Sequence, residues 1–300
     1  FLLANDRRYD VIISEPSNPW MAGLAYLFTK EFYQLAKRRL APGGVMCQWL
    51  QLYRIFPSDV KLVLKTFHSE FPYVTVWSSI PGDLLLVGSM EPQRLDYQRL
   101  AEVMAQPGIH ESLKTVQGER PDVLLDLYWM GNQEVEELTA DTSWIHEDDQ
   151  PWLEFSAPKA LYADPTLTAN FVGLQAFKST PQAIAPAYDP AVEDTRHFLA
   201  VGLMWKARMQ EDKATEALER AVALDASLSE AWRHLGMMYA HQRAWLKAEE
   251  ALEKAAQLAP ADVDVVVAMA RLQREQGRLD EAQPLYDRAA RLAVPDAELA

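Results

Sequence analysis

The chain has 300 residues, of which 49% are hydrophobic and 24% charged, and its formal net charge at pH 7 is −14. This length suffices for one large domain plus a smaller one, and no apolar stretch reaches the roughly 18 residues that a membrane span needs. The single cysteine, Cys47, excludes an internal disulfide framework and a cysteine-rich metal cluster, and the negative charge disfavours nucleic acid as a partner.

The first half of the chain predicts an α/β domain. The run YDVIIS is typical of a strand that is buried on both faces of a parallel sheet. Strands and helices then alternate up to a pair of strands about a Pro-Gly turn, so we expect parallel strands followed by a hairpin. The predicted strands span residues 9–14, 45–50, 74–79 and 83–89, and the predicted helices span residues 28–40 and 57–71. The sequence APGG ends the first of these helices as a C-cap.

The middle of the chain carries weaker signals. Short helical segments are expected between residues 92 and 130, and an acidic stretch follows at 134–155. Five prolines then favour an irregular linker. The expected organisation is an α/β domain at 1–155, a linker at 156–194 and an all-α domain at 195–300.

The last part of the chain repeats with a period of 34 residues, in which Phe198, Trp232 and Val266 take equivalent positions. The middle copy carries the fullest pattern: Trp232, Leu235, Gly236, Tyr239, Ala248, Ala255 and Pro260. This pattern resembles the tetratricopeptide repeat family. The resemblance implies stacked helical hairpins whose concave face binds a peptide or a protein; a stabilising cap on the preceding domain is the alternative.

The candidate site lies directly after the first strand, in the sequence SEPSNPW. In open α/β sheets, ligands bind beyond the carboxyl ends of the strands. Glu15 offers a carboxylate that can hold or deprotonate an amine, Ser17 and Asn18 offer polar contacts, and Trp20 can exclude water and pack against a cation. Gln48, on the second strand, is assigned to the same substrate site. The alternative is that Glu15 only caps a turn and Trp20 belongs to the core.

The segment YDVIISEPSNPWMAGLAYLFTKEFYQLAKRRLAPGGVMCQW resembles the spermidine/spermine synthase (aminopropyltransferase) family, and the resemblance covers roughly residues 8–90. The matching positions are Asp10, Ile12, Ile13, Pro19, Leu27, Phe28, Phe32, Tyr33, Pro42, Gly43 and Gly44. It implies a Rossmann-like sheet of the methyltransferase type and aminopropyl transfer from decarboxylated S-adenosylmethionine to a polyamine, with Glu15 as the base. Asn18 is neutral where the family has an aspartate, and the likeness is closer to a divergent branch that is sometimes fused to tetratricopeptide repeats.

The resemblance also implies what the chain needs from elsewhere. The family's Gly-rich nucleotide-binding turn precedes the matching segment, and a chain that opens on Phe1 without a methionine indicates a fragment or a processed chain. We therefore expect decarboxylated S-adenosylmethionine to be a co-substrate of a longer parent protein, with no tightly bound cofactor. This chain alone should be inactive, and its first strand should present an apolar edge.

The expected partners are a polyamine or other small amine at the loop and a peptide or protein on the repeats, without nucleic acid; a homodimer is left open. The six histidines are scattered, so surface histidines are expected rather than a metal site. A cytoplasmic location is expected, and the resemblance leaves open a membrane anchor in the parent protein.

Two other functions compete with aminopropyl transfer. Asn18-Pro19-Trp20 partly resembles the Asn-Pro-Pro-aromatic loop of S-adenosylmethionine-dependent amine methyltransferases. Alternatively, the domain is a non-catalytic scaffold derived from this fold, and the repeats recruit the partner.

Overall fold

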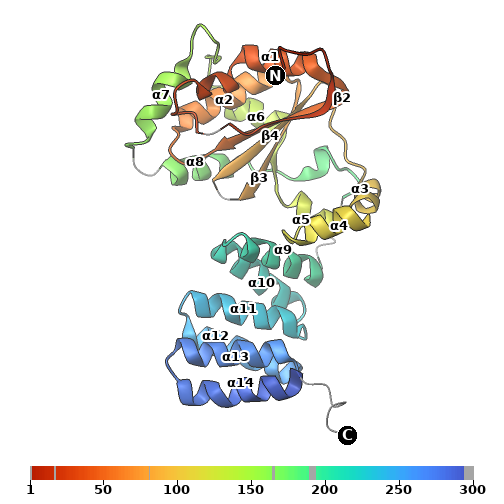
Figure 1. The fold of residues 1–300 in the computed structure, drawn as a ribbon, viewed down its shortest axis with the longest axis vertical. Coiled ribbons are helices and arrows are strands. Elements are labelled where there is room, and N and C mark those ends of the chain that lie inside the picture. Colours follow the sequence, from red (N-terminus) through yellow and green to blue (C-terminus); the bar gives the residue numbers. More distant parts are fainter. Residues whose placement is uncertain (1, 17, 81, 164–165, 189–193, 294–300) are drawn as a thin grey trace. The chain divides into compact units, whose positions relative to one another are not determined.

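The computed structural model describes all residues except 1, 17, 81, 164–165, 189–193 and 294–300 (Figure 1). The chain forms two compact units: residues 1–100 with 124–188, and residues 101–123 with 189–300. The first is a mixed sheet with helices and the second is helical, so the α/β domain followed by an all-α array is confirmed. Residues 156–188, which the sequence predicts as a linker, lie in the first unit and carry helices.

The first unit contains a five-stranded sheet in the order β1-β2-β4-β3-β5. Its strands are β1 (Tyr9–Ser14), β2 (Leu40–Gln51), β3 (Tyr73–Ile80), β4 (Asp83–Ser89) and β5 (Tyr128–Met130). β1 pairs in parallel with β2, whereas β4 is antiparallel to both β2 and β3. The strands β1, β2 and β3 therefore all run in one direction, with the hairpin partner β4 inserted between the last two.

Residues 128–130 differ from the sequence prediction. They were expected within a helical segment, but they form β5, which pairs with β3, and all three are buried. A three-residue strand is too short to show an alternating pattern, so the sequence carries no signal for it.

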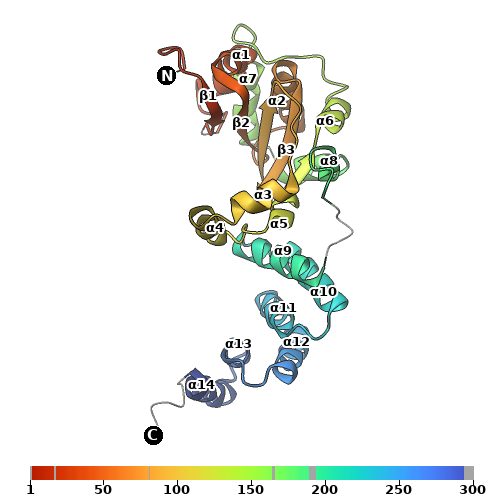
Figure 2. The ribbon, with the colours of Figure 1, turned by 90° about the vertical axis from the view of Figure 1, so that its right-hand side faces the viewer.

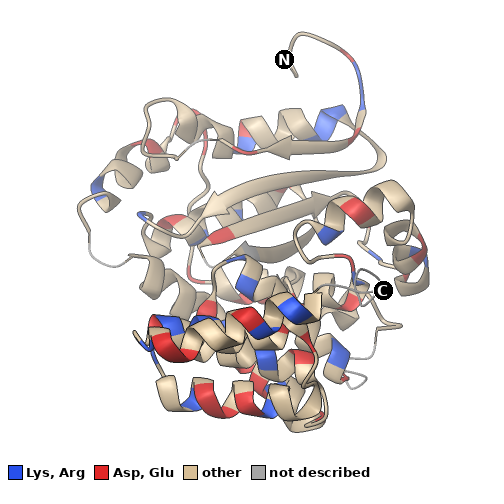
Figure 3. Cartoon of the chain, turned by 60° about the horizontal axis from the view of Figure 1, so that its bottom comes forward, with Lys and Arg blue, Asp and Glu red and all other residues tan. Residues whose placement is uncertain are grey.

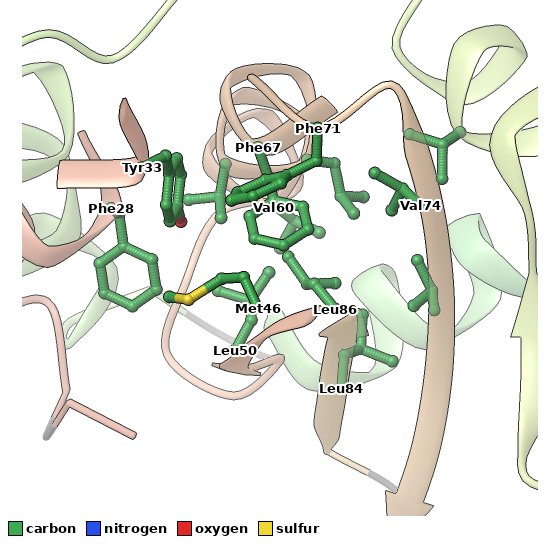
Figure 4. Packing of buried hydrophobic residues seen from close by; sticks show 14 of the residues in the cluster. Phe28, Tyr33, Met46, Leu50, Val60, Phe67, Phe71, Val74, Leu84 and Leu86 are labelled. Carbon is green, nitrogen blue, oxygen red and sulfur yellow. The ribbon is translucent and has the colours of Figure 1, made fainter. Parts of the chain in front are cut away.

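Helices pack on one face of the sheet. They are η1 (Leu24–Phe28), α1 (Lys30–Arg39), α2 (Pro57–Glu70), α6 (Asn132–Leu138), α7 (Trp152–Ala160) and α8 (Thr166–Gln175). The short η2 (Pro181–Ala183) follows them in the chain and contacts β5. Tyr33 and Phe71 flank Phe67 in the core, with ring centroids 5.0 Å and 4.8 Å from it (Figure 4). Gly88 on β4 permits this packing, because a Cβ there would lie 2.6 Å from Phe71 and 2.8 Å from Phe67.

The sequence prediction for the glycine pair at 43–44 is wrong. The pair was predicted to cap the preceding helix, but α1 ends at Arg39 and the chain enters β2 at once. Gly43 has a φ of +72°, and the register with β1 shifts between Tyr9 and Val11. A Cβ on Gly44 would lie 2.9 Å from the carbonyl oxygen of Tyr9. The pair therefore forms an irregularity inside β2 where two backbones approach closely.

The strand β1 stands at one edge of the sheet. Ile12 and Ser14 are buried toward the helices, whereas Val11 and Ile13 are 53% and 70% exposed on the other side. The expected apolar edge is therefore present. At the far end of that side, a separate cluster around Tyr128, with Ile184 and Tyr188, covers the sheet.

The second unit contains three helical hairpins (Figure 2). The first helices are α9 (Thr195–Ala207), α11 (Ser229–His241) and α13 (Val263–Glu275); they begin 34 residues apart and so confirm the predicted period. The second helices are α10 (Glu211–Leu224), α12 (Trp245–Leu258) and α14 (Leu279–Ala293). Within the described residues, no helix of either unit combines the length and the apolar character that crossing a membrane requires.

The segment 101–123 joins the first hairpin. It contains α4 (Pro107–Lys114), and the helices α3 (Tyr97–Met104) and α5 (Pro121–Leu125) begin or end in it. Asp122 accepts hydrogen bonds from both Nε and Nη2 of Arg120 and lies 2.7 Å from Nδ1 of His197 on α9. The Arg208 guanidinium also donates to the Val116 carbonyl oxygen at 3.2 Å. These polar contacts hold the segment against the array.

Candidate functional site

The predicted site loop leaves the carboxyl end of β1 and is tied to α7. The main-chain N–H of Gly23, whose φ of +84° suits glycine, donates to both carboxylate oxygens of Glu154 at 3.1 and 3.2 Å. Met21 donates to the Asn18 carbonyl oxygen at 3.1 Å, and Pro16 and Pro19 are buried. The hydrogen bonds to Glu154 therefore attach the loop to α7 at Gly23.

The predicted site residues occupy different positions. Glu15 is exposed, Asn18 and Trp20 are half-buried, and Gln48 is fully buried. Ser17 lies outside the described residues. Gln48 pairs in register with Ser14 and faces the helices with it, since both are buried among core positions. The structure therefore does not group Gln48 with the exposed carboxylate of Glu15.

The negative charge of Glu15 instead raises the pKa values of two residues on neighbouring strands, Asp83 on β4 and Cys47 on β2. Burial raises the pKa of Asp83, a hydrogen bond from Trp49 opposes this, and the charge of Glu15 raises the pKa further. Burial, and then the charge of Glu15, also raises the pKa of the Cys47 thiol, which argues against a reactive thiolate. Two carboxylates, Glu15 and Asp83, therefore stand close enough to repel each other at this edge.

Aromatic residues lie near one of these carboxylates, Asp83. The Trp20 ring meets Tyr53 edge-on with centroids 6.3 Å apart, and burial together with the charge of Asp83 raises the pKa of Tyr53. We call Glu15, Trp20, Trp49, Tyr53 and Asp83 the carboxyl-edge cluster. Sequence reasoning missed the last three, because Asp83 reaches the site only through the pairing of β4 with β2.

Several buried polar atoms at this edge lack a hydrogen-bond partner among the described residues. They are Oδ1 of Asn18, Oε1 of Gln48, both amide atoms of Gln51 and Oδ1 of Asp83. Gln51 is fully buried and stands opposite Asp83 in the register. A buried polar group without a partner costs about 1–3 kcal/mol, so such a concentration is typical of a place that water or a ligand completes.

A hollow elsewhere in the first unit is lined by none of the predicted site residues. It has a volume of about 740 Å³ and lies over the N-terminus of α2. Trp144 and Trp152 line it together, and their ring centroids are 4.6 Å apart. Asp59 lines it; burial raises the pKa of this carboxyl, against a hydrogen bond from Ser156.

Three histidines are buried, which corrects the expectation of surface histidines. His146 is fully buried and its Nε2 lies 3.0 Å from the Ala25 carbonyl oxygen, while His197 and His234 are 2% and 8% exposed. Within the described ranges, no three His, Cys, Asp or Glu side chains gather in a way that could hold a metal ion.

In the second unit, the first helices of the hairpins lie side by side. The helices α11 and α13 are in contact, and Lys206 on α9 reaches His234 on α11, with Nζ 3.0 Å from Nδ1. We call the surface formed by α9, α11 and α13 the first-helix face. Leu203 and Met237, which are 34 residues apart, occupy equivalent half-buried positions on these helices, and Arg271 takes the third.

One family model matches the second unit. Residues 239–300 match the tetratricopeptide repeat family. This confirms the repeats predicted from the period of 34. No curated protein matches the chain. Among solved structures, the MamA protein is similar with 16% identity, over 66% of this chain and 82% of that one, at a TM-score of 0.33. YrrB, described as a tetratricopeptide repeat protein with an unusual peptide-binding site, is similar with 16% identity, over 68% and 87%, at a TM-score of 0.35.

Proposed function

We propose that the tetratricopeptide array binds an extended peptide segment of another protein along its first-helix face. The observation that supports this most is the repetition of half-buried apolar side chains at equivalent positions of neighbouring first helices, Leu203 and Met237. Adjacent helices place such residues in a row, and a row of apolar side chains suits alternate side chains of an extended peptide.

The test is selection from a displayed library of random decapeptides with the whole chain as bait, followed by affinity measurements on the enriched peptides. Met237→Gln keeps the size of the side chain but makes it polar, and we expect it to weaken binding at least fivefold. Leu246→Gln is the matched control, because Leu246 is 76% exposed on the second helix α12. Failure to enrich any peptide, or equal losses in both variants, would refute the proposal.

We propose, second, that the carboxyl-edge cluster binds a small organic amine, the acceptor class that the aminopropyltransferase resemblance implies. The supporting observation is that the charge of Glu15 acts on Asp83, and that Asp83 in turn acts on Tyr53, whose ring contacts Trp20. A protonated amine would relieve the repulsion between the carboxylates and could pack against an aromatic face. Glu15 follows the carboxyl end of the parallel strand β1, which is the usual place for a ligand in such sheets.

In the reaction that the resemblance implies, the amine nitrogen forms a bond to the aminopropyl carbon of decarboxylated S-adenosylmethionine. Glu15 first accepts a proton from the bound ammonium group, so that the nitrogen lone pair is free to attack. The carbon–sulfur bond then breaks, and its electron pair stays on the sulfur of 5′-methylthioadenosine. A methyltransferase would instead release S-adenosylhomocysteine, and a scaffold would release neither. The identity of the released nucleoside therefore separates these alternatives in the parent protein.

For this chain, amine binding is the direct test. Titration calorimetry with putrescine, spermidine and spermine should detect binding that Glu15→Gln and Asp83→Asn each weaken several-fold. Glu102→Gln, a charge change on α3, serves as the control for a general loss of negative charge. If all three variants lower the amine affinity equally, the attraction is non-specific and comes from the net charge of −14, and the proposed amine site is wrong.

A further inference from the structure

We propose that the hollow over the N-terminus of α2 binds a neutral, planar aromatic small molecule that carries an N–H or O–H donor at its edge. The hollow lies within the first unit and is lined by no member of the carboxyl-edge cluster, so neither the amine site nor the peptide-binding face is involved. Its volume of about 740 Å³ falls within the range of clefts that hold small organic ligands, about 300–1,000 Å³.

Three segments of the first unit bring the lining together. Asp59 belongs to the first turn of α2, and Trp144 lies in the connection between α6 and α7. Trp152, Ser156 and Lys159 all come from α7. Their spacing of four and then three residues places them on one face of that helix. The hollow therefore has an aromatic wall and a polar base that the fold holds next to each other.

Two tryptophans form the aromatic wall. The ring centroids of Trp144 and Trp152 are 4.6 Å apart and their planes are inclined by 59°. The two residues are nevertheless 57% and 43% exposed. A large apolar surface left exposed beside a hollow is typical of a binding site. Because the two rings are inclined, a planar ligand can stack on one of them and meet the other edge to face.

The hydroxyl groups of the lining are held as acceptors. Ser156 donates its hydroxyl hydrogen to the Asp59 carboxylate, and Thr142 donates to Oδ1 of Asp141 at 3.3 Å. Since a hydroxyl has one hydrogen to donate, both oxygens can only accept further hydrogen bonds. Asp59 is 5% exposed and, as a carboxylate, also only accepts. A ligand that reaches these side chains therefore has to supply the donor.

The charged groups of the lining offset one another in pairs. Nζ of Lys61 lies 2.7 Å from Oδ2 of Asp141. Burial raises the pKa of Asp59 and the charge of Lys159 lowers it, so Lys159 is close enough to offset this carboxylate. The helix α7 likewise carries both signs of charge (Figure 3). Neither a cation nor an anion gains a net attraction from such a lining, which favours a neutral ligand.

The test is titration calorimetry of the whole chain with indole and three compounds of the same size and shape of ring. Benzofuran replaces the N–H by an oxygen and so lacks the donor, whereas indole-5-carboxylate and 5-aminomethylindole keep the donor and add a charge. Indole should bind about fivefold more tightly than benzofuran, the effect of one hydrogen bond. Neither charged compound should bind more tightly than indole itself.

Variants locate the binding. Trp152→Leu keeps an apolar side chain but removes the ring, and it should weaken indole binding about fivefold. Phe155→Leu on the same helix is the matched control, because Phe155 is 68% exposed and does not line the hollow; it should change the affinity less than twofold. Asp59→Asn supplies an amide that also donates, so it should narrow the preference for indole over benzofuran. Urea titrations check that each variant is folded.

An aromatic ring with a donor also occurs in the tyrosine side chain of a protein, so N-acetyltyrosinamide is titrated beside indole. If it binds more tightly than indole, the occupant is a protein side chain and the assignment to a small molecule is wrong. Equal affinities for indole and benzofuran would overturn the requirement for a donor. Equal losses in Trp152→Leu and Phe155→Leu would overturn the location, and a chain that binds none of the compounds has no such site.

Discussion

The close approach of α11 and α12 gives a sharp stability prediction for Gly236→Ala. A Cβ on Gly236 would lie 2.7 Å from Cγ and 2.9 Å from Cδ2 of Leu252, and 3.3 Å from the Ala248 carbonyl oxygen. Cγ is the branch point of the leucine and is held by a buried cluster, so it cannot swing away. Forcing an extra methyl into such a site costs about 2–3 kcal/mol, toward the upper end for overpacked cores.

Helix propensity acts in the opposite direction. Replacing glycine by alanine inside a helix stabilises it by about 1 kcal/mol. The net expectation for Gly236→Ala is therefore a loss of about 1–2 kcal/mol, measured as the free energy of unfolding from urea titrations followed by circular dichroism. Gly202→Ala should lose a similar amount, because its Cβ would lie 2.7 Å from Leu218.

The third hairpin supplies the control. Ala270 holds the position equivalent to Gly236 and is fully buried, and Tyr286 holds the position equivalent to Leu252. Ala270→Gly should also destabilise the array, by about 1–2 kcal/mol, because it lowers helix propensity and removes a buried methyl group. A Gly236→Ala protein that is as stable as the wild type or more stable would refute the reasoning, since propensity would then outweigh the steric clash.

Two further predictions concern pH. Burial raises the pKa of Asp122, but hydrogen bonds from His197 and Arg120 outweigh this effect and hold the pKa well below its usual range. The folded repeat unit should therefore lose stability as the pH falls below about 4. In urea titrations at pH 3 and pH 6, Asp122→Asn should show a smaller loss than the wild type. An unchanged slope would mean that the contact contributes nothing. Burial lowers the pKa of His146, although the hydrogen bond to Ala25 opposes this effect. Protonation therefore favours the unfolded state, and the free energy of unfolding of the first unit should fall as the pH drops below about 6.5. His146→Gln should remove this dependence between pH 7.5 and 5, and a slope that persists would place its origin elsewhere.

The repeat array could be predicted from the sequence because its signals are local. Each hairpin buries residues that recur at a fixed spacing, and Gly202 and Gly236 mark the same contact in successive copies. The strands β1 to β4 were also predictable, since each is an apolar run bounded by turn residues. In both cases the residues that specify an element lie within it.

The remaining features depend on contacts between distant parts of the chain. β5 is a strand only because Tyr128 and Met130 pair with β3. The irregularity at Gly44 depends on the backbone of Tyr9, which a local turn rule does not consider. His146 is buried because its ring reaches Ala25, over a hundred residues earlier in the chain. No window of sequence contains both partners of any of these contacts.

The same reasoning changes how the substitution at Asn18 should be weighed. A comparison of the loop with the family's motif considers only the residues of that loop. Because Asn18 stands where the family has an aspartate, the loop has one carboxylate instead of two. Charges act through space, however, and Asp83 at the start of β4 stands close enough to Glu15 for its pKa to respond. If Asp83 performs the second carboxylate's task, Asn18→Asp should add little to the amine affinity of the wild type. In the Asp83→Asn background, the same change should restore part of the loss. Such a dependence of one substitution on the other would show that the two positions serve one site.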